Sequence, residues 1–379
     1  MRRKSFRRDV LAGGLLGVVA LAGVGVSVPA QAVGTGVQRE SAPRSAVGAI
    51  QQEIARELAM SLNDGSWRAQ LRTAVVGGEG DLQALASRSS ATGGRRLAAE
   101  VVDADRKLRE AKGLPGDAGS LLRLRLGTPE MARQLDGATM PWIAVASGNE
   151  KAGSVVAFDN RGVAHPLDPM VAPRHPVYVV DVDVAKAQQV GLRVVEQELA
   201  AKGVTAPKKA QQAQLGGGFW TSKITAVRVS DDEEPWTKGD AEMFTLVTGF
   251  GLDGKPVVNT VTMPYLDTDG KIYRPNQILV NWSTYKYNLA DAVMMEDDGD
   301  TNYRALAQAL TTALLTITDQ GAYKPLVDAV IAAIPDSWWT DDPDFVDAWY
   351  TLAKNDNGVR QGSRRNGWMG LTPYYVPAF

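Results

Sequence analysis

The sequence predicts an α+β protein, in which an N-terminal helical segment and a small mixed α/β region precede a C-terminal antiparallel β-sandwich with added helices. Three patterns predict this fold class. Apolar residues recur at helical spacing early in the chain, short β-branched runs separated by turn residues follow, and from Phe219 onward strand-like runs end in clusters of Gly, Asp or Pro. The 379 residues, 44% of them apolar, exclude a disordered or fibrous protein.

The first 32 residues have the three parts of a signal peptide. Five basic residues lie within Met1–Arg8, an apolar run extends from Val10 to Val28, and a small-residue cleavage site follows at Ala30-Gln31-Ala32. Five glycines make the run weakly hydrophobic for a permanent anchor, so we expect cleavage and a secreted, extracellular protein without a membrane contact. The Arg7-Arg8 pair fits a twin-arginine signal as well as a Sec signal, and the export route stays open.

The N-terminal half of the mature chain is expected to be helical first and mixed afterwards. Residues 33–44 read as a flexible leader, and residues 45–205 as the helical and mixed α/β region. Apolar spacing predicts helices at Val47–Leu62, Trp67–Val76, Leu97–Ala111, Pro129–Leu135 and 184–201. Strands are expected at Trp142–Ala146, Val155–Asp159 and Val177–Val182, with a hairpin turn at Asn160-Arg161-Gly162.

The C-terminal half is expected to be mostly strands. Residues 206–218 are rich in Lys, Gln and Gly and predict a linker, and residues 219–379 predict the sandwich domain with its acidic loops. The expected strands are Ile224–Val229, Met243–Gly249, Val257–Met263, Ile278–Trp282, Ala292–Met295 and a closing strand at Trp368–Val376. Two helices are expected among them, at Tyr303–Leu315 and Leu326–Ile334.

Charge and cysteine usage exclude several classes of function. Without the signal peptide the chain has 36 basic and 42 acidic residues, a net charge of −6, and residues 216–345 alone hold 9 basic and 20 acidic residues, a net charge of −11. Such a segment repels nucleic acids and anionic membranes and attracts divalent cations. The absence of cysteine excludes disulfides, a cysteine nucleophile and thiolate metal sites.

Acidic clusters at the ends of expected strands predict a calcium site in the sandwich. Calcium takes six to eight oxygen ligands from carboxylates and carbonyls of flexible loops, and several of these loops could supply them from one end of the fold. This C2-like layout resembles that of C2-type calcium sandwiches, in which aspartates from separate loops meet at one edge, although no sequence signature is matched. The spacing does not match an EF-hand. Any single cluster is more often an ordinary turn, but about eleven unbalanced negative charges in one domain repel each other without a counter-ion. The best candidate ligands are Asp231, Asp232, Glu234, Glu242, Glu296, Asp298 and Asp300.

Other acidic positions belong to the same pattern but are weaker candidates. They are Asp267 and Asp269 in LDTDG, Asp291, and the run from Asp341 to Asp347.

A family resemblance rests on the segments ITAVRVSDDEEPWTKGDAEMF, NQILVNW, EDDGDTNYRALAQAL and DDPDFVDAWYTL. They are similar to segments of the secreted bacterial proteins catalogued as domain of unknown function 3103. The similarity extends from about Ala49 to the C-terminus. It implies export and a single shared architecture, and it brings no assigned reaction and no catalytic residues.

A secreted hydrolase is the alternative from another class. His165 and His175, the only histidines, both precede proline, and no G-x-S-x-G or H-E-x-x-H motif accompanies them, so we expect turn or surface histidines. A glycosidase needs only two carboxylates and aromatic platforms, both of which are abundant here, and a peptidase-like activity also stays open. Catalytic residues cannot be assigned, calcium is the only expected cofactor, and the extracellular ligand stays unknown.

Overall fold

The computed structural model describes residues 45–135, 139–146, 154–204, 217–230, 236–239, 242–297, 299–334 and 345–378. These residues all belong to one compact unit, Ser41–Phe379. The expected signal peptide and leader, and nearly all of the expected linker, lie outside the described residues, so the proposed domain boundaries stay predictions. Among the helices that the structure describes, none has the length and apolar character to cross a membrane.

Side chains that cap backbone N–H groups determine where the first helices begin. The helices are α1 (Ala46–Ser61), α2 (Gly65–Val76), α3 (Leu82–Arg88) and α4 (Thr92–Ala111). Ser45 accepts a hydrogen bond from Gly48 N at the start of α1, and Asp64 accepts from Ser66 N and Trp67 N at the start of α2. The other oxygen of Asp64 accepts from Gly93 N, which ties α2 to α4. The predicted helices at Val47–Leu62, Trp67–Val76 and Leu97–Ala111 are therefore present.

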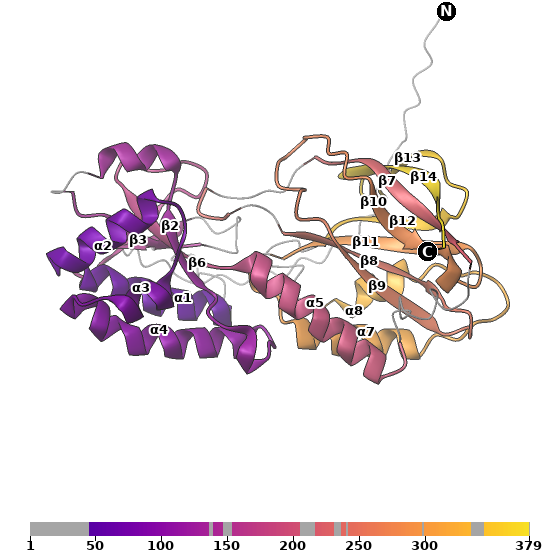
Figure 1. Ribbon diagram of the computed structural model, residues 1–379, viewed down its shortest axis with the longest axis horizontal. Helices are drawn as coiled ribbons and strands as arrows, with labels where there is room; N and C mark the ends of the chain where they lie inside the picture. Colours follow the sequence, from indigo (N-terminus) through magenta and orange to yellow (C-terminus); the bar gives the residue numbers. More distant parts are fainter. Residues whose placement is uncertain are drawn as a thin grey trace, which may run out of the picture. The chain divides into compact units, whose positions relative to one another are not determined.

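A six-stranded mixed sheet accompanies these helices (Figure 1). Its strand order is β1-β2-β6-β3-β4-β5; β3 and β6 are parallel and the other pairs antiparallel. Leu124, Ile143 and Val180 are buried in the same core as Ile54 and Leu58 of α1, so the helices cover one face of the sheet. The strands are β1 (Gly80–Asp81), β2 (Leu122–Leu126), β3 (Trp142–Val145), β4 (Val155–Phe158), β5 (Ala164–Leu167) and β6 (Val177–Val182).

The C-terminal half contains the expected antiparallel sandwich, built from two four-stranded sheets. One core contains Val227 of β7 and Met369 of β14 from the first sheet together with Val247 of β8 and Trp349 of β12 from the second. The first sheet, in spatial order, is β10 (Gln277–Asn281), β7 (Phe219–Val229), β14 (Gly367–Val376) and β13 (Gly358–Gln361). The second is β12 (Phe345–Ala353), β11 (Leu289–Glu296), β8 (Met243–Phe250) and β9 (Pro256–Thr262).

Helices cover the outer face of the second sheet (Figure 1). These helices are α5 (Val184–Ala201), α7 (Tyr303–Leu315) and α8 (Val327–Ala333). Elsewhere in the chain, short 3-10 turns occur at η1 (Gly116–Ala118), η2 (Pro129–Gln134) and η3 (Trp282–Thr284). Phe244 and Val293 of the sheet share a core with Leu306 and Leu310 of α7. Sandwich and added helices together confirm the predicted α+β class.

Three predictions about local structure were wrong. The run Pro129–Leu135 is a 3-10 turn rather than an α-helix, and Asp291 lies buried within β11 rather than in a loop. The third is the acidic run that ends at Asp347. It was expected at the end of a strand, whereas the residues from Phe345 onward form the strand β12. Asp347 fits in this strand because backbone N–H groups surround its carboxylate, a tertiary effect that overrides the low strand propensity of Asp.

Candidate functional site

The strand register of the second sheet brings three of the acidic segments to one end. Glu296 at the end of β11 pairs with Met243 at the start of β8, and Met295 pairs with Phe345 at the start of β12. The ladder continues one step further, since Asp297 N donates to Glu242 O at 3.1 Å. We call this edge, at which Glu242, Glu296 and Asp297 meet beside the start of β12, the acidic end.

The first sheet of the sandwich reaches the same end. Gly367 of β14 pairs with Val229, the last residue of β7, and its N–H donates at 2.8 Å to the Asp347 carboxylate of β12. Gly270, in the turn that carries Asp267 and Asp269, donates its N–H to Val229 O at 2.9 Å. The segments that follow β7 and β11 and those that precede β8 and β12 therefore start or finish at one end of the sandwich.

Only part of the predicted ligand set lies in the described chain. Asp231, Asp232, Glu234 and Asp298 lie outside the described residues. Glu296 is buried, Glu242 is partly buried and Asp300 is exposed. Within the described ranges, no group of three or more His, Asp or Glu side chains has an arrangement that could hold a metal ion. The calcium site accordingly stays a prediction.

Several of the weaker acidic candidates bind the protein's own donors. Asp347 accepts from the N–H groups of Ala348, Arg364 and Gly367, all at 2.8 Å. Asp267 accepts from the hydroxyl groups of Tyr273 and Thr268. These two carboxylates therefore have the structural role that is common for Asp, because they stabilise turns and strand ends.

Asp291 is a third carboxylate that binds backbone donors. It accepts from Leu326 N at 2.6 Å and from Thr351 N at 2.8 Å, and its side chain is fully buried. Thr351 has a φ of 54°, a strained value for a β-branched residue, and lies where the pairing of β11 and β12 shifts register. Burial raises the pKa of Asp291, and the two N–H donors oppose that effect.

A buried lysine, which the charge count alone did not reveal, contacts the acidic end. Lys112 follows α4, and its Nζ lies 2.6 Å from Gly299 O and 3.6 Å from Asp297 Oδ1. Both charged side chains are fully buried. Asp297 also accepts from Gly299 N at 3.0 Å and from the Tyr303 hydroxyl. One of the negative charges of this loop thus has an internal counter-ion.

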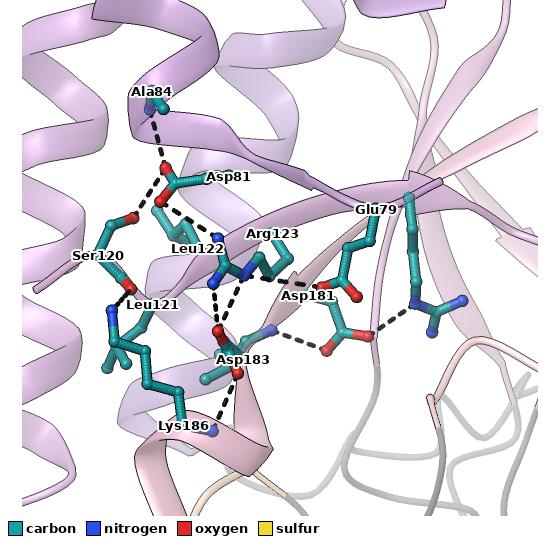
Figure 2. A network of polar contacts seen from close by, with 12 residues as sticks. Glu79, Asp81, Ala84, Ser120, Leu121, Leu122, Arg123, Asp181, Asp183 and Lys186 are labelled. Atoms are coloured by element: carbon teal, nitrogen blue, oxygen red, sulfur yellow. Dashed lines mark hydrogen bonds and ion pairs between the residues drawn. The ribbon is translucent and has the colours of Figure 1, made fainter. Parts of the chain in front are cut away.

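A second polar network lies on the six-stranded sheet (Figure 2). Arg123 of β2 points toward three carboxylates: it contacts Asp183, lies 3.2 Å from Asp81 and lies 3.9 Å from Glu79. On the same strand Arg125 Nε lies 2.9 Å from Asp181 Oδ2. Sequence inspection missed this network, although the alternation Leu122-Arg123-Leu124-Arg125-Leu126 is a signal for a strand with one charged face.

Burial shifts two carboxylates of this network toward the protonated form. The pKa of Glu79 is raised by burial and by the charge of Asp181, while Arg123 opposes the shift. Burial also raises the pKa of Asp181, against the attraction of Arg125. Arg125 further donates to Thr237 O at 2.5 Å, so the network contacts the described part of the segment between β7 and β8.

The two histidines stack on one tryptophan. Trp142 lies parallel to His165 with ring centroids 4.4 Å apart, and its centroid lies 4.5 Å from that of the tilted His175 ring. His165 Nε2 lies 3.3 Å from Asp159 Oδ2, and His175 Nε2 lies 2.9 Å from Met140 O. Burial lowers the pKa of His175, which favours the neutral ring. Packing and hydrogen bonds thus account for both imidazoles. The sequence predicts turn or surface histidines, and His175 does lie in a connection, but His165 lies in β5 and both rings are partly buried.

Comparisons with known proteins identify the family of the chain. The model of the family described as "Protein of unknown function (DUF3103)" matches residues 51–378, and the chain belongs to this family. The predicted family resemblance is confirmed. No curated protein and no solved structure matches the chain.

Proposed function

We propose that this member of a family of unknown function is a calcium-stabilised extracellular binding or structural module, with the cation held at the acidic end of its sandwich. The ligands would come from Glu242, Glu296 and Asp300 together with Asp231, Asp232, Glu234 and Asp298. Calcium at this end would link the loops of the two sheets, and the unknown extracellular ligand would bind the ordered surface.

The proposal rests on one observation, which is the strand register that brings the acidic strand ends together. Glu296 pairs with Met243, and Asp297 N bonds to Glu242 O, so segments 53 or more residues apart in sequence meet at one edge. Lys112 balances one carboxylate, whereas residues 216–345 have a net charge of −11. The remaining excess of negative charge favours a divalent cation from the medium.

Calcium titration of residues 33–379 by isothermal calorimetry tests the proposal. We expect saturable binding, with a dissociation constant on the order of 10⁻⁴ M as for other extracellular calcium modules, and much weaker binding of magnesium. The variant Glu296→Gln/Asp300→Asn should lose at least tenfold in affinity. Glu53→Gln/Asp253→Asn is the matched control, because it changes the same two residue types on exposed side chains, one in α1 and one in the turn after β8. Equal affinity in both variants would refute the assignment.

A secreted hydrolase is the second candidate, and the network around Arg123 favours it. Glu79 is half exposed and its pKa is raised, which is what a general acid in glycoside hydrolysis requires. Asp81, two residues further on, borders an open hollow of about 670 Å³ whose other lining residues are Gln70, Thr73, Ala84, Leu85 and Arg88. A panel of polymeric glycans and casein tests this candidate. Turnover abolished by Glu79→Gln would support it, and turnover unchanged in that variant would exclude Glu79.

A further inference from the structure

We propose that the outer face of the first sandwich sheet binds an anionic polysaccharide, a polymer of sugars that carry carboxylate or sulfate groups. The inference rests on the extracellular binding role proposed above and names its class of ligand, but it does not require calcium. The face belongs to β10, β7, β14 and β13, and to the segment around Tyr273, which pairs with Val227 of β7. The opposite face of the same sheet packs in the sandwich core.

Charge is distributed unequally between the two sheets of the sandwich. Residues 219–229, 270–281 and 358–378, which form the first sheet and the segments next to its strands, contain no Asp and no Glu. Their basic residues are Lys223, Arg228, Lys271, Arg274, Arg360, Arg364 and Arg365. The strands of the second sheet contain no Lys and no Arg, and their acidic residues are Asp291, Glu296 and Asp347. The overall negative charge of residues 216–345 therefore conceals a basic sheet, which favours an anionic ligand.

Two basic side chains of β7 point to the outer face. Val227 and Val229 are buried in the sandwich core, so Arg228 between them points outward. Lys223 precedes the core residue Ile224 and points outward for the same reason. The two basic residues lie five positions apart on the strand, or about 16 Å at ~3.3 Å per residue, so an extended polymer can contact both.

The basic groups of this face are not neutralised within the protein. Arg228 Nε donates to Gly270 O at 2.8 Å, and Lys223 Nζ lies 4.7 Å from the centroid of the Tyr374 ring. Arg274, directly after Tyr273, is exposed. Within the described part of the chain, no ion pair involves Lys223, Arg228 or Arg274. Carboxylate or sulfate groups of a ligand would supply the missing partners.

Exposed apolar side chains lie among these basic groups. Ile278 pairs with Lys223 across the sheet and is 40% exposed, and Tyr374 is 43% exposed. Val359 of β13 is 60% exposed, and Ile272, which precedes Tyr273, is 44% exposed. Sugar rings present C–H groups that pack on such apolar and aromatic surfaces, while their charged groups bind the basic side chains.

The centre of the face carries only short side chains. Gly370 of β14 pairs with Ala226 of β7 on one side and with Val359 of β13 on the other. Two positions away on β14, Trp368 pairs with Arg228, and in the other direction Thr372 pairs with Lys223. The face is therefore flat enough to lie along a polymer chain between the two basic residues of β7.

Polysaccharides fit this face better than other polyanions. Lys223 covers the ring of Tyr374, which leaves that ring less open to stacking with a nucleic acid base. The apolar side chains lie within a flat sheet that has Gly370 and Ala226 at its centre, whereas a membrane-binding surface buries an apolar face in the bilayer. The expected export of the protein also favours an extracellular polysaccharide.

Isothermal calorimetry of residues 33–379 in EDTA tests the proposal with polygalacturonate, alginate and chondroitin sulfate as probes and dextran as the neutral control. We expect saturable binding to at least one anionic probe and none to dextran, with affinity decreasing from about 50 mM to about 500 mM salt. Lys223→Gln/Arg274→Gln should weaken binding about tenfold or more. Lys255→Gln/Arg304→Gln is the matched control, because it removes the same charges from side chains that are 66% and 52% exposed in other elements, and its affinity should stay within about twofold.

Two neighbouring tyrosines give a second matched pair. Tyr374 and Tyr375 are 43% and 46% exposed, but Tyr375 contacts Trp220 on the other side of the strand. Tyr374→Ala should weaken binding about threefold or more, and Tyr375→Ala should change it by less than about twofold. Every variant is measured at a temperature at which circular dichroism shows it to be folded.

The outcomes separate this inference from the proposed calcium site. No binding to any anionic probe, equal binding to dextran, or equal loss of affinity in the two double variants would overturn the inference. Tighter binding to single-stranded DNA or to phosphatidylglycerol vesicles than to the polysaccharides would overturn the class of ligand. Because EDTA removes calcium, binding in this buffer supports the inference even if the calcium titration fails, and calcium binding without polysaccharide binding overturns this inference alone.

Discussion

The contact between Lys112 and Asp297 predicts a large and measurable coupling in stability. At the observed 3.6 Å and an effective dielectric constant of ~20, the attraction between the two charges is about 4–5 kcal/mol before the cost of removing both from water. Removal of one partner leaves the other charge buried without compensation, which costs about 3–5 kcal/mol. For a chain of this length, with about 2 °C of melting temperature per kcal/mol, Lys112→Met should lower the melting temperature by roughly 6–10 °C.

A double-mutant cycle separates this coupling from general loss of packing. Asp297→Asn keeps an acceptor for Gly299 N, and Lys112→Met keeps the volume of the side chain, so the double variant buries no unpaired charge. We expect it to be more stable than the sum of the single losses predicts, by about 2 kcal/mol. The assay is urea unfolding at pH 7, followed by circular dichroism. Additive losses, to within about 0.5 kcal/mol, would refute the reasoning.

Three further predictions concern other parts of the fold. Gly191→Ala would place a Cβ 2.1 Å from the buried Tyr303 ring. Despite a gain in helix propensity, this variant should lose about 1–2 kcal/mol of unfolding free energy, measured by urea unfolding. Gly65→Ala is the control and should be nearly neutral, because the nearest atom to its new Cβ lies at 3.7 Å. Because the pKa of Asp291 is raised by burial, its contribution to stability is complete below its unfolded pKa of about 3.8 and decreases as pH rises through the raised folded value. The difference in melting temperature between the unsubstituted protein and Asp291→Asn should therefore shrink from pH 4 to pH 7, and a growing difference would contradict the raised pKa. Arg123→Met should lower the melting temperature more at low salt than at high salt, because salt screens the ion pairs of the network in Figure 2. Arg123→Lys should recover only part of the lost melting temperature. A loss that does not depend on salt would mean that the ion pairs contribute little to stability.

Much of the fold was predictable because local patterns and tertiary packing agree. The apolar stripes of α1 and α4 are the faces that are buried, and the turn at Asn160-Arg161-Gly162 joins β4 to β5 as expected. The strand β2 was missed even though its sequence, Leu-Arg-Leu-Arg-Leu, alternates with period two. Its arginines are partly buried because carboxylates of β6 and of the following turn face them.

The chemistry of the site was less predictable, because partners distant in sequence determine it. Asp267, Asp291 and Asp347 belong to the same acidic pattern as the predicted ligands, but in the folded chain a hydroxyl group binds Asp267 and backbone N–H groups bind Asp291 and Asp347. Lys112 lies 185 residues before Asp297, so no local pattern could have paired the two. Strand register, in contrast, brings the acidic strand ends together, as the sandwich interpretation required.

Thermal unfolding of residues 33–379, first in EDTA and then in about 10 mM calcium, tests the central claim most directly. With a dissociation constant of roughly 10⁻⁴ M, binding adds about 2.7 kcal/mol, or a rise of about 5 °C in melting temperature. The account predicts this rise with calcium and little or none with the same concentration of magnesium. An unchanged melting temperature in calcium, or an equal rise with both cations, would contradict a calcium site at the acidic end.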